Sequence, residues 1–335
     1  RLKILSRLNV AEKRKPQDGR LKTKSPEGDE IELRISTLPT AFGEKMVMRV
    51  FDPDVLVRSF EQLGFTKEDH ETWNKMTSHP HGIIFVTGPT GSGKTTTLYS
   101  TLKQLATSEV NVCTIEDPIE MVEPSFNQMQ IQANIDVDFA QGVKAMLRQD
   151  PDIIMIGEIR DLQTADMAIQ AALTGHLVLS TLHTNDAPSS VTRLIDLGVP
   201  PYMISATVLG VMAQRLVRTL CPNCKAPSET DPQAWDELVR PFKMKMPETL
   251  YQPVGCLECR GTGYRGRMGV YETMPLRTTL KNHITRGADL ETLTRASLKS
   301  GMKPLRISGA MKVAKGLTTI EEVMRVTPSQ DILMG

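Results

Sequence analysis

The chain has 335 residues, of which 40% are hydrophobic and 24% are charged, and this ordinary globular composition excludes a disordered or collagen-like chain. Forty lysines and arginines balance thirty-nine acidic residues, so the basic excess typical of nucleic-acid-binding proteins is missing. No apolar run reaches the roughly 18 residues that suggest a membrane-spanning helix, and the first residues lack the features of a signal peptide. We expect a soluble, intracellular protein of about two domains. Because the first residue is not Met, we take the sequence to be a piece of a longer chain.

The first fifty or so residues predict a small α+β domain. A basic pattern with helical spacing covers residues 1–15. The segments 31–36 and 45–50 have the character of strands, and turn residues such as Gly19 and Gly28 punctuate this region. We therefore predict a partial α+β domain over 1–54, followed by a linker over 55–62.

From residue 63 onward, short apolar segments alternate with helical ones. Predicted strands cover 82–88, 110–117, 152–158 and 176–183, and two of the predicted helices cover 94–106 and 162–173. This alternation is typical of a parallel sheet that helices cover on both faces. A metal-binding subdomain over 216–272, with a Gly-rich turn at 261–269, and a helical tail over 273–335, helical from 278 to 328, complete a predicted α/β domain over 63–335.

The segment GPTGSGKT at 88–95 matches the phosphate-binding P-loop at every fixed position, between a predicted strand and a predicted helix. Lys94 would reach the β- and γ-phosphates of a nucleoside triphosphate, and the Thr95 hydroxyl would bind Mg²⁺. A glycine-rich turn with a chance Lys-Thr is the alternative. The residues predicted to bind ATP are Gly88, Pro89, Thr90, Gly91, Ser92, Gly93, Lys94, Thr95 and Thr96.

Acidic residues follow two of the predicted strands. Glu116 lies at the end of the strand predicted at 110–117, Glu120 follows that strand, and Glu158 ends the strand at 152–158. The carboxyl ends of parallel strands meet at one edge of a sheet, so these acids could face the P-loop and hold Mg²⁺ or position water. Solvated turns or a helix cap are the alternative. His176 and His183 flank the last predicted strand, and we place both at the same edge as the acids, with His183 as a phosphate sensor or a structural residue.

Four of the five cysteines form two pairs, Cys221 with Cys224 and Cys256 with Cys259, with 31 residues between the pairs. Such pairs suit a tetrahedral, structural zinc site. Disulfides are the competing interpretation but are rare in cytosolic proteins. A zinc ribbon that binds nucleic acid is a further alternative, against which the acidic surroundings argue. Cys113 lies in an apolar run and is predicted to be a buried structural thiol.

Together these motifs resemble those of a known superfamily. The segments GPTGSGKTTTLYS, TIEDPIE, RQDPDIIMIGEIRD and GHLVLSTLHTNDA look like the Walker A, Asp box, Walker B and His box of the secretion ATPases. The tetracysteine segment is similar to that of the branch that contains the type II secretion and type IV pilus assembly ATPases. The resemblance covers nearly the whole chain and implies a RecA-like core, a truncated N-terminal domain and Mg²⁺-dependent ATP hydrolysis.

The resemblance also implies roles for individual residues. Glu120 would be the general base that activates water, although the choice between Asp-box carboxylates stays open, and Glu158 would support Mg²⁺ or the same water. His183, together with His176, would link the γ-phosphate to movement of the strand that they flank. The arginines of the first domain would reach a nucleotide across a domain or subunit boundary, where a guanidinium neutralises transition-state charge; they are Arg34 and Arg49. Other family arginine positions carry Arg148, Arg160 and Arg193, and Lys144 stands where many relatives have arginine.

As a whole, the resemblance implies a cytoplasmic homo-hexamer, peripheral to the inner membrane, that drives a polytopic platform protein and so powers assembly of pilin or pseudopilin fibres. Pilus assembly and type II secretion share these motifs, and the residues around His183 favour the pilus slightly. A hexameric nucleic-acid translocase and a nucleotide-bound scaffold without turnover are the alternatives; few aromatics and a neutral charge argue against the translocase. We expect no nucleic-acid partner and no membrane insertion. Strands and a docking domain that relatives carry upstream are missing, so we expect a fragment that hydrolyses ATP without docking.

Overall fold

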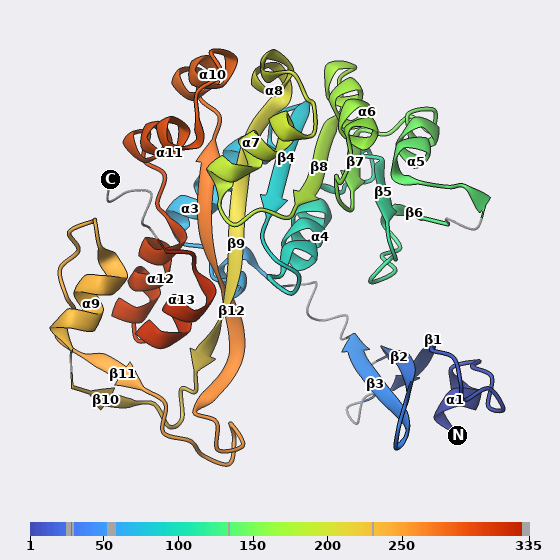
Figure 1. Ribbon diagram of the computed structural model, residues 1–335, viewed down its shortest axis with the longest axis horizontal. Coiled ribbons are helices and arrows are strands. Elements are labelled where there is room, and N and C mark those ends of the chain that lie inside the picture. Colours follow the sequence, from blue (N-terminus) through green and yellow to red (C-terminus); the bar gives the residue numbers. More distant parts are fainter. Residues whose placement is uncertain (25–27, 29, 52–57, 133–134, 230, 330–335) are drawn as a thin grey trace. The chain divides into compact units, whose positions relative to one another are not determined.

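The computed structural model describes residues 1–24, 28, 30–51, 58–132, 135–229 and 231–329 (Figure 1). The chain divides into two compact units, Arg1–Arg58 and Ser59–Gly335. Of the linker expected at 55–62, residues 55–57 lie outside the described part. Across the described helices, none combines the length and the apolar character that crossing a membrane requires.

The first unit is an antiparallel sheet with strand order β1-β2-β3 and one short helix. The helix expected over 1–15 is wrong in its length, because Arg7 adopts a positive φ of 59° that ends the helical path. The Asn9 side chain then accepts hydrogen bonds from the backbone of Ala11 and Glu12, which stabilises a turn in place of more helix. The elements are α1 (Leu2–Leu5), β1 (Gln17–Lys24), β2 (Glu30–Thr40) and β3 (Gly43–Phe51).

The second unit is built on a seven-stranded sheet with the order β12-β9-β4-β8-β7-β5-β6. Its strands run parallel except β12, which pairs antiparallel with β9. The predicted alternation of strands and helices is confirmed, as is the α/β fold class. The strands of this sheet are β4 (Gly82–Thr87), β5 (Val112–Glu116), β6 (Asn127–Gln130), β7 (Ile153–Ile156), β8 (Leu177–Leu182), β9 (Val208–Leu220) and β12 (Tyr264–Pro275). A separate two-stranded sheet pairs β10 (Ala226–Ser228) antiparallel with β11 (Leu250–Gln252).

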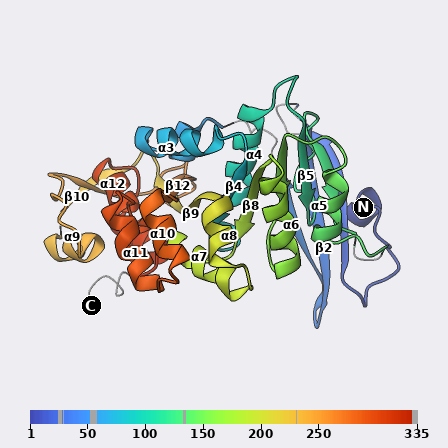
Figure 2. The same cartoon turned by 90° about the horizontal axis from the view of Figure 1, so that it is seen from above.

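Helices cover both faces of this sheet. Helices α5 to α8 pack on one face, whereas α2, α3 and α4 lie on the other (Figure 2). The central strands are fully buried because both of their faces are covered; Ile84, Ile154 and Val178 are 0% exposed. The helices are α2 (Phe60–Leu63), α3 (Lys67–Thr77), α4 (Lys94–Leu105), α5 (Phe139–Met146), α6 (Leu162–Leu173), α7 (Ala187–Asp196), α8 (Pro201–Thr207), α9 (Pro232–Val239), α10 (Thr278–Thr285), α11 (Leu290–Lys299), α12 (Leu305–Ala314) and α13 (Ile320–Val326).

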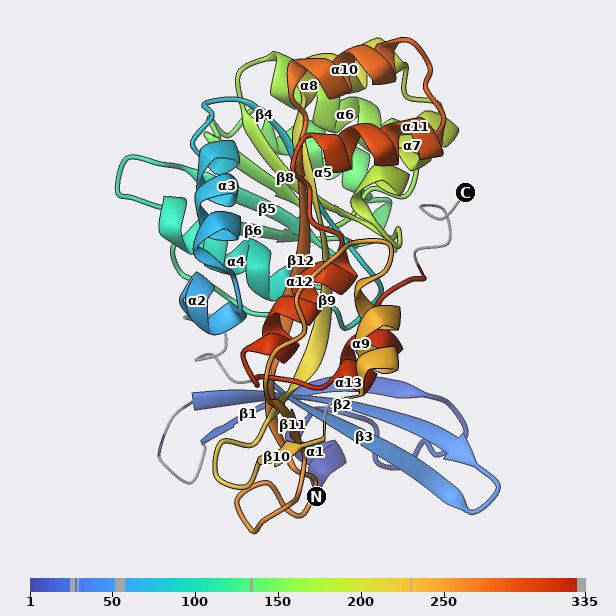
Figure 3. The same ribbon diagram turned by 90° about the vertical axis from the view of Figure 1, so that its left-hand side faces the viewer.

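Strands β9 and β12 form a long two-stranded ribbon that our sequence analysis did not predict. They pair up to Leu220 and Tyr264, past the last contact of β9 with β4 at Ala213. Helices α12 and α13 pack against this ribbon (Figure 3). The turn predicted at 261–269 is therefore partly wrong, because β12 begins at Tyr264. The prediction arose from glycines that have a local role, since the pairing register shifts between Tyr264 and Arg267 and Gly266 has a φ of 76° there.

Candidate nucleotide site

The predicted P-loop lies between β4 and α4, at the edge of the sheet where the parallel strands end. Gly88 has a φ of 146°, and a side chain there would place its Cβ 2.5 Å from the Gln214 carbonyl oxygen. Gly93 has a φ of 87° and immediately precedes the helix. These glycines let the loop curl tightly, so that its backbone amides and the N-terminus of α4 are available to an anion.

The side chain of Lys94 folds back into this loop. Its Nζ donates hydrogen bonds to the carbonyl oxygens of Gly88, at 2.7 Å, and Pro89, at 3.1 Å. Burial lowers the pKa of Lys94 to about 8; the carboxylates of Glu158 and Glu120 oppose this shift, and Arg215 adds to it. An ammonium withdrawn from water in this way is stabilised by an arriving negative charge.

Other atoms of the loop fit a phosphate as well. The buried Ser92 hydroxyl has no hydrogen-bond partner among the residues that the structure describes. Pro89, Thr90 and Gly91 are exposed, and Thr95 and Thr96 are half-buried in the first turn of α4. The loop therefore offers an unused buried donor, a desolvated ammonium and accessible backbone to a ligand.

Glu158 follows β7 and is 9% exposed. Its two carboxylate oxygens have different partners: Oε1 lies 2.5 Å from Nη2 of Arg160, and Oε2 lies 3.2 Å from Nε2 of His183. His183 directly follows β8, so the neighbouring strands β7 and β8 bring these side chains together. The guanidinium of Arg160 thus forms an ion pair with the carboxylate of Glu158. Arg160, one of the family arginine positions, therefore pairs with an acid of the site.

His176 does not share this edge, and its expected position there is wrong. It precedes β8, whereas His183 follows it, so the whole strand separates the two imidazoles. The Nδ1 atom of His176 lies 2.9 Å from the Ala171 carbonyl oxygen and 3.1 Å from the Thr174 hydroxyl, at the end of α6. Its surroundings are those of a helix terminus.

The Asp box contains acids in two environments. Glu116 ends β5, is 4% exposed and accepts hydrogen bonds from three side chains, those of Tyr99, Thr114 and Gln128. Glu120 lies four residues further on and is exposed. Its charge favours the protonated form of Lys94, so it is near enough to the P-loop to influence it. Glu120 is thus the acid with an accessible carboxylate.

Two residues of β9 that our sequence analysis missed support the P-loop from behind. Gln214 Nε2 donates to the Ser92 carbonyl at 2.9 Å, and Gln214 Oε1 accepts from Thr97 Oγ1 at 2.8 Å. Arg215, which is 5% exposed, donates to the carbonyls of Gln214 and Asn185. The available signal was a polar pair inside the apolar run VLGVMAQRLV, since buried polar side chains usually have assigned partners.

In the first unit, three arginines form one cross-strand row. Arg20 on β1 lies opposite Arg34 on β2, which in turn lies opposite Arg49 on β3. Glu32 on the same face is 3.8 Å from Arg20 and 4.0 Å from Arg34. Opposed like charges are unfavourable in a sheet, so this row fits an anionic ligand. Arg20 was not among the predicted residues. The remaining expected basic residues are exposed on the second unit: Lys144, Arg148 and Arg193.

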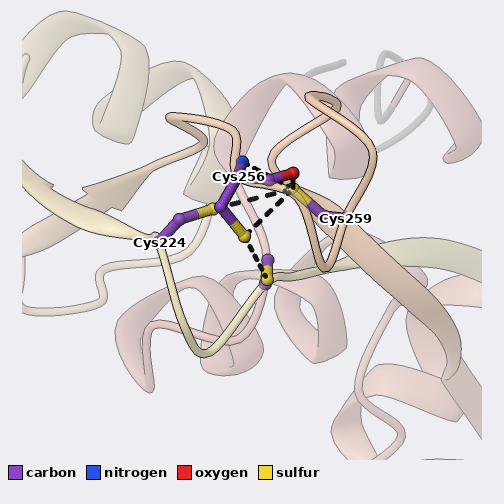
Figure 4. A group of neighbouring side chains, drawn as sticks. Cys224, Cys256 and Cys259 are labelled. Carbon is purple, nitrogen blue, oxygen red and sulfur yellow. Dashed lines mark hydrogen bonds between the residues drawn. The ribbon is translucent and has the colours of Figure 1, made fainter.

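The four paired cysteines gather at the far end of the ribbon, and Figure 4 shows three of them converging. Sγ–Sγ distances are 3.9 Å between Cys221 and Cys256, 3.8 Å between Cys224 and Cys259, and 3.7 Å between Cys256 and Cys259. A tetrahedral zinc ion with Zn–S bonds of about 2.3 Å separates its sulfurs by roughly 3.8 Å. The sulfurs are too far apart for disulfides, and the cluster can hold a metal ion.

Backbone amides favour the thiolate at one cysteine of this cluster, Cys259, whereas burial raises the pKa of Cys224 to about 11. Burial alone would raise the pKa of Cys259, but the N–H groups of Cys256 and Gly263 outweigh it and lower that pKa to about 6. A thiolate is the form that binds zinc.

The fifth cysteine, Cys113, is 2% exposed in the core, and its burial raises the pKa of its thiol. The prediction that Cys113 is buried is confirmed.

Comparison with known proteins gives a consistent result. Residues 1–325 match the family described as Type II/IV secretion system protein. The chain is 66% identical over 328 residues to the type IV pilus assembly ATPase TfpB of Acinetobacter baylyi, which is 98% of this chain and 56% of that protein. It is 46% identical over 327 residues to the type II secretion system ATPase E of Vibrio cholerae, at 98% and 64%. The chain thus spans between about half and two thirds of the length of these relatives.

Solved structures support the same fold. The crystal structure of the pilus retraction motor PilT with bound ADP has a TM-score of 0.68 and 25% identity, over 95% of this chain and 79% of that one. The ATPase DotB of Legionella pneumophila has a TM-score of 0.67 and 22% identity, over 93% and 77%. These likenesses confirm the predicted RecA-like architecture.

Proposed function

Because this chain belongs to the type II/IV secretion system protein family, we propose that it is a Mg²⁺-dependent ATPase that works in a hexameric motor for fibre assembly. One observation carries the ATPase proposal: the desolvated ammonium of Lys94 in the P-loop faces a sheet edge that also holds Glu158 and His183. Cationic and acidic groups together at this edge suit phosphoryl transfer to water, in which charge on the phosphates must be neutralised.

The chemistry divides among these side chains. Lys94 and the loop amides bind the phosphates, and the carboxylate of Glu120 accepts the proton of the attacking water. Thr95 and Glu158 would hold Mg²⁺, which would offset phosphate charge when it is bound. The imidazole of His183, held by Glu158, contacts the γ-phosphate, so that departure of this phosphate after hydrolysis shifts β8.

A second group of residues acts between subunits. Arg34 and Arg49 would contact a nucleotide from another domain or subunit, where a guanidinium stabilises charge in the transition state by up to about 10³–10⁵ in rate. The arginine row supports this role because it concentrates positive charge on one face of the first sheet. If so, activity requires an assembled ring.

For the biological role we favour pilus assembly, since the identity to TfpB is 66% and that to the Vibrio secretion ATPase is 46%. We propose that the ring works on the cytoplasmic side of the inner membrane, on a platform protein that feeds pilin or pseudopilin subunits into a fibre. The four cysteines would bind one structural Zn²⁺, because their sulfur spacing matches a tetrahedral ion and leaves no open position.

The first test compares Mg²⁺-ATP hydrolysis by the purified chain and by Glu158→Gln over a range of protein concentrations, with mass measured by light scattering. We expect turnover to rise as hexamers form and to fall at least a hundredfold in the variant. Single-stranded DNA should not stimulate it. Equal rates in monomer and hexamer would refute the role of arginines between subunits, and nucleotide binding without turnover in a hexamer would refute the motor.

A further inference from the structure

The loop that carries Glu120 is anchored on both sides of that residue. On one side the Ile119 amide donates to Gln130 Oε1 at 3.3 Å. On the other the Met121 carbonyl oxygen accepts from Gln128 Nε2 at 2.9 Å, and it lies 3.1 Å from the Tyr99 oxygen, whose single proton it shares with the carboxylate of Glu116. Glu120 therefore projects as an exposed side chain from a backbone that is held immediately before and after it.

The anchor at Met121 is part of a buried polar network. The Tyr99 hydroxyl donates to Glu116 Oε2 at 2.7 Å, and Gln128 Nε2 lies 3.2 Å from Glu116 Oε1 and 2.9 Å from the Tyr99 oxygen. Gln128 is held in this orientation because its Oε1 accepts from the Glu123 amide at 2.7 Å. Burial, together with the nearby charge of Glu116, raises the pKa of Tyr99 above its usual range, so its hydroxyl stays a donor.

This network connects the acid loop to the P-loop. Tyr99 lies on α4, the helix that begins at Lys94, and is 1% exposed. Gln128 lies on β6, which pairs with β5, the strand that ends at Glu116. A rigid helix and two paired strands thus fix the Met121 carbonyl relative to the residues that bind phosphate. Networks with all members satisfied are suited to this kind of positioning.

We propose that Tyr99 and Gln128, oriented by the buried carboxylate of Glu116, are positioning residues that hold Glu120 at the reacting water. This inference rests on the proposed function for the role of Glu120, but the anchoring itself does not. It explains why one acid of the Asp box is buried and fully partnered: Glu116 orients the donors that fix its exposed neighbour. The proton of the attacking water passes to Glu120, and neither Tyr99 nor Gln128 exchanges one.

Tyr99→Phe tests the proposal, because it removes one oxygen and keeps the ring. We expect kcat for ATP to fall about tenfold with KM unchanged, since only the placement of the base is altered. In a Glu120→Gln background the same change should have no further effect. Gln128→Leu should behave like Tyr99→Phe. The matched control is Tyr264→Phe, which removes a hydroxyl at the end of the ribbon, 3.3 Å from the Thr319 hydroxyl, and should keep the wild-type rate.

Deuterium uptake by peptides that cover 117–123 provides a readout without turnover. Faster exchange in Tyr99→Phe than in Tyr264→Phe is expected, and unchanged exchange would overturn the inference whatever the activity. A tenfold loss of kcat that persists in the Glu120→Gln background would also overturn it, because Tyr99 would then act elsewhere. Faster exchange in a protein whose wild type hydrolyses no ATP would instead support the anchoring and refute the proposed function.

Discussion

Gln214 offers a direct measurement of how strongly β9 braces the P-loop. Gln214→Leu keeps the volume of the side chain but leaves the Ser92 carbonyl and the Thr97 hydroxyl without their present partner, both in the buried interior. An orphaned buried polar group costs about 1–3 kcal/mol, so two of them should lower the free energy of unfolding of the second unit by about 2–6 kcal/mol. Nucleotide affinity should fall as well, because Ser92 lies in the loop.

The chain offers a selective probe for this measurement. Its two tryptophans, Trp73 and Trp235, both lie in the second unit and are 0% and 2% exposed. Intrinsic fluorescence during guanidinium unfolding therefore reports on that unit and not on the first. Gln141→Leu, at an exposed position on α5, is a control for the loss of an amide and should change the unfolding free energy by less than about 0.5 kcal/mol.

A double-mutant cycle tests the reasoning itself. Thr97→Val alone leaves Gln214 Oε1 unpaired, whereas the combination with Gln214→Leu removes both partners of that hydrogen bond. Replacing both partners is cheaper than orphaning one, so the double variant should be at least about 1 kcal/mol more stable than the sum of the single effects predicts. Additive costs, or a Gln214→Leu cost below about 0.5 kcal/mol, would refute the idea that this amide braces the loop.

Three further outcomes follow from the site. Cys256→Ser should bind less than the one zinc ion per chain expected of the wild type, and the free energy of unfolding of its second unit should be lower by about 2 kcal/mol or more. Metal analysis and fluorescence unfolding measure the two effects. A wild-type chain that is purified without zinc and is as stable as the zinc-bound chain would contradict this prediction. Because burial lowers the pKa of Lys94 to about 8, about half of the Lys94 side chains are neutral at pH 8, and ATP binding there should take up as much as about half a proton per chain. At pH 6 Lys94 is already charged and should take up none. Calorimetry in two buffers of different ionisation enthalpy would detect the difference. Burial raises the pKa of Glu272 from 4.5 to about 7. Between these pH values the folded state holds a proton that the unfolded state releases, so the free energy of unfolding should fall by about 3 kcal/mol as the pH rises from 4.5 to 7. Glu272→Gln should flatten this dependence on pH.

Local motifs could be predicted from the sequence, because their geometry depends on neighbouring residues. The P-loop follows from its glycines and the strand before it, and Cys221 and its partners from their spacing. His176 was misplaced for a reason that the sequence contains: a strand enters the sheet at one edge and leaves at the other, so residues at its two ends cannot share an edge. Glu116 and Glu120 could not be told apart, because the burial of the first depends on Tyr99, which is close only in the fold.

Long-range pairing was the harder part. The register that aligns Arg20 with Arg34 depends on the length of the connection between β1 and β2, and the apolar pattern alone did not fix it. Likewise β9 and β12 are separated along the chain by the whole cysteine segment, and they pair over a stretch in which Arg215, Arg218 and Arg267 interrupt the apolar pattern. Tertiary partners make these polar residues compatible with strands: Arg218 pairs with Glu322 on α13, for example.

The ribbon also explains what a metal would add to this fold. Beyond Ala213, β9 has lost its contact with β4 and continues for seven residues to Leu220, or roughly 23 Å, paired with β12. A two-stranded ribbon is marginal on its own, and here α12 and α13 support its flanks. Cys221 directly follows the last residue of β9, and Cys259 lies five residues before β12, so a zinc ion would tie together the two chains at the ribbon's free end. Because Gln214 and Arg215 lie on the same strand, fraying of that end would loosen the support of the P-loop. We therefore expect the four paired cysteines to support the nucleotide site through β9, although they lie far from the nucleotide loop in sequence.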